Sequence, residues 1–146
     1  MVEKSKPSVY FFFKSINLGL KNRKKLKDFI ILLFKKEGKK IEQLNYIFCN
    51  DRYLLEINKK YLGHNFYTDI ITFKLSEGKK PIIADIYISK ERVWDNAHLL
   101  EKTFQTELHR VIFHGALHLC NYYDKGSRQK LKMTRKEDYY LRKYFS

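Results

Sequence analysis

Two kinds of apolar pattern alternate along the chain. In four short runs, β-branched and aromatic residues follow one another directly, which is typical of strands. These predicted strands cover residues 9–13, 44–49, 70–73 and 82–88. The last two flank a turn-forming stretch, residues 76–81 (Ser-Glu-Gly-Lys-Lys-Pro), so we expect them to form a hairpin.

In the segments between these runs, apolar residues recur every three or four positions, as on one face of a helix. Residues 21–36 show this most clearly, with lysines on the opposite face and Gly38 after the end. Further helices are predicted where polar residues can cap a helix, and a basic helix forms the C-terminal segment. Asn50-Asp51 and Ser89 can cap two of these helices, a third begins after Thr103, and the last covers residues 127–144.

This order of elements predicts an α+β fold, a small mixed β-sheet of about four strands packed with helices. A chain of 146 residues, 44% of them hydrophobic, can form one core of ordinary size, so we expect a single domain over residues 1–146. Apolar runs such as residues 29–34 are far shorter than the roughly 18 to 20 residues that span a bilayer. Residues 1–7 lack the pattern of an export signal, so we expect a cytoplasmic protein.

The chain carries 30 Lys and Arg residues against 16 Asp and Glu, a formal net charge of +14. Such an excess favours a polyanionic partner, because each cation that contacts a phosphate releases counterions. A composition rich in Lys, Ile, Asn, Tyr and Phe can also come from an A/T-rich genome without selection for binding, so charge alone leaves nucleic-acid binding open. Cys49 and Cys120 are far apart in apolar segments, and we expect buried free thiols.

The segment richest in candidate chemistry begins at His114. His118 lies four residues further on the same predicted helix, so both rings project from one face and can bind one ion. Asp124 follows shortly after, near Gly126, where the chain can leave the helix and turn back. Three protein ligands and an open fourth position are typical of a catalytic zinc site. We therefore predict His114, His118 and Asp124 as metal ligands and catalytic residues for one divalent ion, with zinc the first candidate.

Two histidines on an apolar helix can also be packed and hydrogen-bonded without a metal, which is the ordinary explanation of an isolated pair. Gly115 stands where zinc proteases of the His-Glu-x-x-His type carry their general base, so the sequence argues against that mechanism of peptide hydrolysis. His64, His98 and His109 occupy polar or boundary positions. We expect solvated rings without a metal role there.

Three motifs follow one another along the chain: residues 58–61 (Asn-Lys-Lys-Tyr) with 68–73 (Thr-Asp-Ile-Ile-Thr-Phe), then 84–89 (Ala-Asp-Ile-Tyr-Ile-Ser), then 114–119 (His-Gly-Ala-Leu-His-Leu). They resemble, in the same order, motifs of the YbeY-type rRNA maturation endoribonucleases. Residues 114–119 match the start of that family's helix-borne signature His-Gly-x-Leu-His-Leu-x-Gly-Tyr-Asp-His. The resemblance covers about residues 45–125.

The resemblance implies a metal-dependent endoribonuclease that favours single strands and acts in small-subunit rRNA processing and ribosome quality control. Its partners would be RNA and the ribosome or small-subunit proteins, with no DNA expected. Two positions depart from the family pattern. Asp124 replaces the usual third histidine, and carboxylate oxygen is an acceptable zinc ligand. Leu62 stands where most members carry an arginine, whose role another cation must then take.

Several residues near the proposed site are candidates for RNA contacts. Lys59, Lys60, Lys125 and Arg128 flank it in sequence, and Tyr61, Tyr67 and Tyr122 offer faces for base stacking. For any one of these residues, a solvated cation or a core aromatic is the simpler explanation. Thr68 and Asp69 either touch substrate, brace the site, or only cap the entrance of the strand that follows. Asp85 could orient the metal helix or a ligand histidine, or act on RNA.

Two other functions stay open at this point. In the first, a non-catalytic assembly factor binds RNA or the ribosome, and the metal only holds the helix to the following loop. A fourth protein ligand would favour that function, whereas an open ligand position favours catalysis. In the second, the same ligands serve a hydrolase of small molecules or peptides, which would leave the charge of +14 without a role.

Overall fold

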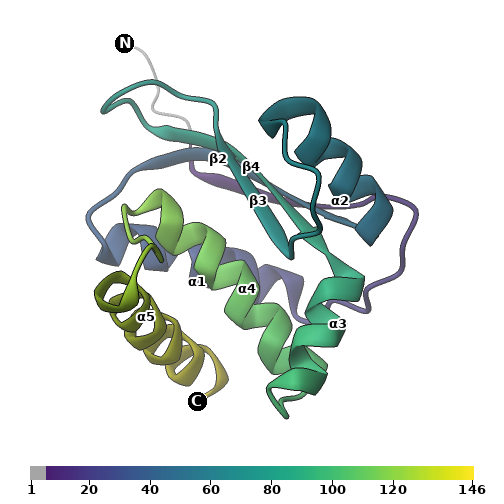
Figure 1. The fold of residues 1–146 in the computed structure, drawn as a ribbon. Coiled ribbons are helices and arrows are strands. Elements are labelled where there is room, and N and C mark those ends of the chain that lie inside the picture. Colours follow the sequence, from purple (N-terminus) through teal and green to yellow (C-terminus); the bar gives the residue numbers. More distant parts are fainter. Residues whose placement is uncertain (1–5) are drawn as a thin grey trace.

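The computed structural model describes residues 6–146 and contains one mixed four-stranded sheet in that range. The strands are β1 (Ser8–Phe13), β2 (Ile41–Cys49), β3 (Ile70–Lys74) and β4 (Ile82–Ser89). The helices are α1 (Arg23–Lys36), α2 (Asp51–Ile57), η1 (Asn58–Leu62), α3 (Lys90–Leu99), α4 (Phe104–Leu119) and α5 (Ser127–Phe145). The predicted mixed sheet packed with helices is confirmed (Figure 1).

The strand order in the sheet is β1-β2-β4-β3. The three strands β1, β2 and β4 run parallel, and β3 pairs antiparallel with β4. The predicted hairpin is therefore correct, with Ile70 opposite Ile88 and Lys74 opposite Ala84. Strand β4 lies between β2 and the short edge strand β3. Strand β3 in turn contacts helix α4.

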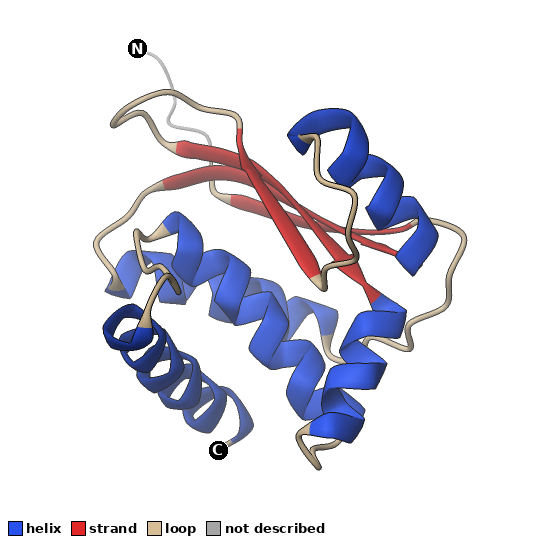
Figure 2. Cartoon of the chain, viewed as in Figure 1, coloured by secondary structure: helices blue, strands red, loops and turns tan. Residues whose placement is uncertain are grey.

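Helices cover the two faces of the sheet unequally (Figure 2). On one face, α1 and α4 pack against the strands and α5 packs on α4, and together they enclose the main core. On the other face, α2 covers a smaller cluster made by Cys49, Leu54 and Ile71. Alternate residues of one strand point to opposite faces. Each β4 side chain therefore belongs to one of these two layers.

Helix α4 is buried at the centre of the larger layer. Its Gly115 faces the sheet so closely that an added Cβ would lie 2.9 Å from Ile70 Cδ1 and 3.1 Å from Ile86 Cγ2. The Tyr46 hydroxyl donates a hydrogen bond to the Ile112 carbonyl, 3.0 Å away, from the neighbouring strand β2. Glycine at position 115 thus lets α4 lie close to the edge of the sheet that β3 forms.

The three predicted helix starts are confirmed by their capping bonds. The side chains of Asn50, Ser89 and Thr103 accept hydrogen bonds from the backbone N–H groups of Tyr53, Arg92 and Thr106. Gly63 ends the second helical segment in a left-handed conformation, after a π-helical turn that the sequence pattern did not predict. The first helix begins at Arg23 rather than at residue 21. Strand β2 begins at Ile41 rather than at residue 44, because Ile41 pairs with Ile82 of β4.

The prediction for His109 is wrong. Its side chain is buried between α4 and α5, where the ring stacks on Tyr144 and lies near Phe145. Its Nδ1 lies 2.6 Å from the Gln105 carbonyl oxygen, so this buried ring nitrogen has a hydrogen-bond partner. His64 and His98 are exposed as expected, and Cys49 and Cys120 are buried free thiols.

Within residues 6–146, none of the helices combines the length and apolar character that a membrane crossing requires.

Candidate metal centre

Helix α4 has one polar stripe along an otherwise apolar surface. Glu107, Arg110, His114 and His118 follow one another at intervals of three or four residues, so their side chains share a face of the helix. Glu107 is buried, and His114 is only 15% exposed. Polar side chains at such depth need partners, and the neighbouring loop and α5 supply them.

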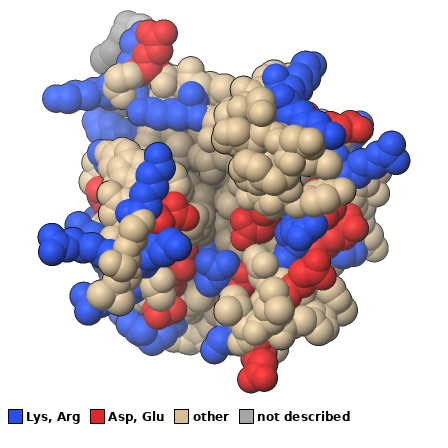
Figure 3. Space-filling model, viewed as in Figure 1, with Lys and Arg blue, Asp and Glu red and all other residues tan. Residues whose placement is uncertain are grey.

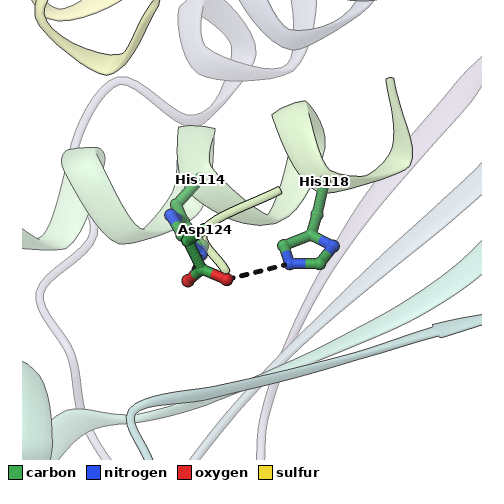
Figure 4. Close-up of side chains that lie close together, drawn as sticks. All are labelled: His114, His118 and Asp124. Carbon is green, nitrogen blue, oxygen red and sulfur yellow. Dashed lines mark ion pairs between the residues drawn. The ribbon is translucent and has the colours of Figure 1, made fainter. Parts of the chain in front are cut away.

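The chain turns sharply after α4 and returns to the polar stripe. Asn121 has φ of 70° and Gly126 has φ of 84°, both in the left-handed region. The backbone N–H of Tyr122 donates to the Leu117 carbonyl, 3.1 Å away, which fixes the first part of this loop on the helix end. The turn brings the carboxylate of Asp124 back beside the two histidine rings (Figure 4).

The three predicted ligands converge. His114 Nε2 lies 3.6 Å from Asp124 Oδ2, and His118 Nε2 lies 3.9 Å from Asp124 Oδ1. One ligand atom from each residue can be chosen so that all lie within 4.8 Å of one another. Ligands at about 2.0–2.1 Å from a tetrahedral zinc stand roughly 3.3 Å apart, so small side-chain adjustments would complete such a site. The donor set, two imidazole nitrogens and one carboxylate, fits a divalent ion.

A second carboxylate, that of Glu137, orients the first predicted ligand, His114. His114 Nδ1 lies 2.6 Å from Glu137 Oε2 of α5, and the Glu137 side chain is only 5% exposed. This hydrogen bond favours the tautomer that carries its proton on Nδ1, which leaves the Nε2 lone pair directed at the Asp124 side. Arrangements of this kind, in which a carboxylate holds a histidine, are usual around protein metal ions.

Arg110 compensates the charge of the buried carboxylates. Its guanidinium lies 2.5 Å from Glu107 Oε2 and 3.3 Å from Glu137 Oε1. Burial by itself lowers the pKa of Arg110, but the hydrogen bonds and the charges of Glu107 and Glu137 outweigh burial and raise it. Arg110 is therefore fully charged and committed to these two partners.

The second predicted ligand, His118, favours its neutral form. Burial and the neighbouring His114 lower the pKa of His118, although Asp124 opposes them. A neutral imidazole is the form that binds metal ions. The Tyr123 ring packs edge-on against His118, with ring centroids 5.5 Å apart, and limits the positions that this ligand can take.

A cavity of about 220 Å³ opens beside the ligand atoms. The start of β3 forms its other wall, through Thr68, Asp69, Ile70 and Thr72. Asp69 Oδ2 accepts a hydrogen bond from Asn96 Nδ2 at 3.0 Å, and burial raises the pKa of the Asp69 carboxyl. The structure therefore places the predicted residues Thr68 and Asp69 on the same cavity as the three ligands, where they can both brace it and face its contents.

The four predicted cations do not line this cavity. Lys59 and Lys60 are exposed on η1, and Arg128 is exposed in the first turn of α5. Lys125 follows Asp124 directly, and its backbone N–H donates to Gln129 Oε1. All four side chains are accessible to an RNA that extends beyond the cavity, and their role in binding stays a prediction.

Asp85 does not orient α4 or a histidine. Its neighbour Ile86 faces Gly115, so Asp85 points to the opposite face of the sheet, where it accepts a hydrogen bond from Asn45 Nδ2 at 2.9 Å. The residue that does orient His114 is Glu137. The sequence held one signal for it, because Glu137 interrupts the stripe of apolar residues formed by Met133, Tyr140 and Tyr144 at helical spacing.

The fold and the site together define a mixed-sheet protein with a candidate three-ligand metal centre on a central helix. Comparison with known proteins gives the class more narrowly. The family described as Endoribonuclease YbeY matches residues 14–145 of this chain. Endoribonuclease YbeY of Cytophaga hutchinsonii is 47% identical to it over 90% of this chain and 92% of the relative, and that of Karelsulcia muelleri is 44% identical over 89% and 92%.

A solved structure gives the same result at the level of the fold. The solution structure of a Thermotoga maritima protein is 28% identical in sequence and superposes with a TM-score of 0.62, covering 94% of this chain and 89% of that protein. The chain belongs to the endoribonuclease YbeY family, as its motifs indicated.

Proposed function

We propose that this protein is a metal-dependent endoribonuclease that acts in maturation of small-subunit rRNA. Family membership supports the cleavage of RNA. The observation that carries the proposal is the convergence of His114, His118 and Asp124 at the mouth of a cavity. The three residues are the ligands of one divalent ion, for which zinc is the first candidate because its sites commonly combine imidazole and carboxylate donors.

A bound divalent ion in such a site polarises a phosphoryl oxygen and lowers the pKa of water. The protein's own residues supply the positioning. Glu137 holds His114 in one tautomer, and Arg110 pairs with the Glu137 carboxylate. Thr68 and Asp69 face the space next to the ligands, and we assign them to contacts with the substrate.

The cations further out are assigned to the phosphates on either side. Lys125 directly follows the candidate ligand Asp124, and we assign it as the cation that replaces the arginine missing at Leu62. Arg128 extends the same surface onto α5, and Lys59 and Lys60 supply charge from η1. Phosphate contacts of this kind give affinity without reading sequence. The expected partners are therefore rRNA and the small ribosomal subunit, in the cytoplasm.

A metal that only holds α4 to the following loop is the less favoured function. In the range 6–146, the candidate ligand cluster contains three residues and no fourth histidine, cysteine or carboxylate. A structural zinc site is normally closed by four protein ligands. The Asp124 side chain is also 47% exposed, which leaves the ligand atoms accessible from the cavity.

The experiment combines metal analysis of the purified protein with cleavage of a single-stranded RNA. We expect one equivalent of metal and RNA cleavage for wild type, and loss of both for His114→Ala, His118→Ala and Asp124→Ala. His98→Ala is the matched control, because His98 is exposed on α3 and outside the cluster. Stoichiometric metal that survives in the His118 and Asp124 variants would refute the ligand assignment. Retention of metal without any RNA cleavage by wild type would instead favour the non-catalytic function.

A further inference from the structure

A second hollow, of about 590 Å³, lies between the C-terminal end of α1 and one face of α5. It shares none of its lining residues with the metal cavity. Five cations surround it: Lys36, Lys132, Arg135, Lys136 and Arg142. We propose that this hollow, which we name the α1–α5 groove, binds the phosphate backbone of the RNA outside the cleavage site. The inference rests on the proposed function and deepens it.

The cations form a continuous row because of their spacing on α5. Residues 132, 135, 136, 139 and 142 recur at three- and four-residue intervals, so they share one face of the helix. At 1.5 Å per residue, Lys132 and Arg142 lie about 15 Å apart along the axis. A single free phosphate cannot contact both. The row therefore fits an extended chain of phosphates rather than a small anion.

The single acid in the groove is already neutralised. The Glu37 side chain is only 9% exposed and lies 3.2 Å from Lys136 Nζ. It also accepts hydrogen bonds from the hydroxyls of Tyr122 and Tyr140. Five cations against this one carboxylate leave the groove strongly positive. Within residues 6–146, Lys36, Lys132, Arg135 and Arg142 have no carboxylate within 4.0 Å, so their charges are available to a ligand.

Tyr139 lines the groove and lies in the positive field of its cations. The Lys36 ammonium donates a hydrogen bond to the Tyr139 hydroxyl, and the pKa of that phenol is lowered by this bond and by the charges of Lys36, Lys143 and Lys136. The Lys36 ammonium also lies over the Tyr139 ring, 4.6 Å from its centroid. A positive groove lined by an aromatic ring is typical of sites that bind single-stranded nucleic acid.

The groove adjoins the loop that carries Asp124. The Tyr122 ring, two residues before Asp124, lies 5.7 Å from Lys132 Nζ and 5.4 Å from Lys136 Nζ. Figure 3 shows Lys and Arg side chains gathered over the part of the surface where Figure 1 places α5. An RNA strand that leaves the metal cavity past this loop reaches the cations of α5 next.

The test measures the affinity for a fluorescent single-stranded RNA at several salt concentrations. Arg135→Gln/Arg142→Gln removes two groove charges, and the control Lys79→Gln/Lys80→Gln removes the same charge from the exposed turn between β3 and β4. Each lost phosphate contact should flatten the slope of log affinity against log salt by about 0.7. We therefore expect a change of about 1.4 for the groove variant and none for the control, with metal content unchanged in both.

The outcomes separate this inference from the proposed function. An unchanged slope in the groove variant overturns the inference, even where wild type cleaves RNA. A flattened slope in a protein that binds but does not cleave RNA supports the groove and refutes the proposed activity. A third measurement titrates inorganic phosphate: saturable binding that the groove variant loses, with no change in the RNA slope, would show a site for a small anion and overturn the inference. Circular dichroism of both variants shows whether each is folded.

Discussion

At the scale of single residues, the candidate site depends on a buried carboxylate that is not itself a ligand. Glu137 is held between Arg110 and His114, and it is the group that sets which nitrogen of His114 carries a proton. Partners of this kind commonly contribute 10- to 100-fold to metal affinity, because they orient the ring and raise its basicity. The candidate metal centre therefore extends from α4 into α5.

We predict that Glu137→Gln weakens the affinity for zinc by about 10-fold or more while the three ligands stay in place. The amide has nearly the same shape but gives His114 a weaker hydrogen-bond acceptor. The affinity is measured by competition with a chelator of known strength. Asp138→Asn is the control, since Asp138 is the adjacent acid and is exposed. Equal affinities for the Glu137 variant and wild type would contradict the orienting role.

The capping residues show what single positions reveal before a structure is known. Asn50, Ser89 and Thr103 could be predicted as helix starts because a capping bond joins atoms only three residues apart. Glu137 could not be assigned in this way. Its partners His114 and Arg110 are 23 and 27 residues distant, and a charged residue on an amphipathic helix is by default placed in solvent. The buried His109 was mispredicted for the same reason.

At the scale of elements, α1, the loop after α4 and α5 meet at the carboxylate of Glu37. The hydroxyl of Tyr122 donates to it at 2.7 Å, and Lys136 and the Tyr140 hydroxyl supply further hydrogen bonds. Burial raises the pKa of Glu37, but the hydrogen bonds outweigh this and lower the pKa below its ordinary value. The ionised form is therefore the one that stabilises the junction.

The sign of the pH dependence follows from this shift. Because the pKa of Glu37 is lower in the folded protein than in the unfolded chain, its stabilisation is present above the unfolded value of about 4.3 and is lost as the pH falls through the folded value. We predict that Glu37→Gln lowers the free energy of unfolding by about 1–2 kcal/mol at pH 7 and by much less near pH 3. Urea unfolding at both pH values measures this.

A control variant distinguishes the loss of the Glu37 hydrogen bonds from a general effect of removing one negative charge. Glu42→Gln removes an exposed carboxylate on β2, and we expect only a small change in unfolding free energy at either pH. If Glu37→Gln destabilised the protein equally at pH 7 and pH 3, the ionised carboxylate would not be the stabilising form. The effect would then come from packing at the junction.

The order of the strands in the sheet could not be predicted from the sequence patterns of the single elements. Every strand could be placed from its run of β-branched and aromatic residues, and the hairpin from its turn. The position of β4 between β2 and β3 depends on pairings between segments far apart in sequence, such as Ile86 with Tyr46. The π-helical turn of η1 was also missed, because its sequence continues an ordinary helical pattern.

At the scale of the whole molecule, the excess of cations lies on several surfaces rather than one. The α1–α5 groove holds one group, η1 carries Lys59 and Lys60, and Lys125 and Arg128 follow the candidate ligand Asp124 in sequence. The sequence indicated the charge and the candidate ligands but not the groove, because the groove cations come from helices about 100 residues apart. Whether this charge reflects RNA binding or only composition can be decided by salt dependence, since counterion release scales with the number of phosphates contacted.

We predict a clearly negative slope of log affinity against log salt for wild type with single-stranded RNA, and a slope less steep by about 1.4 for Lys59→Gln/Lys60→Gln, at about 0.7 for each lost contact. That variant should keep its metal, because neither lysine belongs to the ligand cluster. Asp124→Ala should show the opposite behaviour, with metal and cleavage lost and most of the slope retained. Filter binding from low to physiological salt, with metal analysis of each protein, gives both quantities. A wild-type affinity that does not change with salt would show that the cations do not contact phosphate, and RNA cleavage would then rest on family membership and the metal centre.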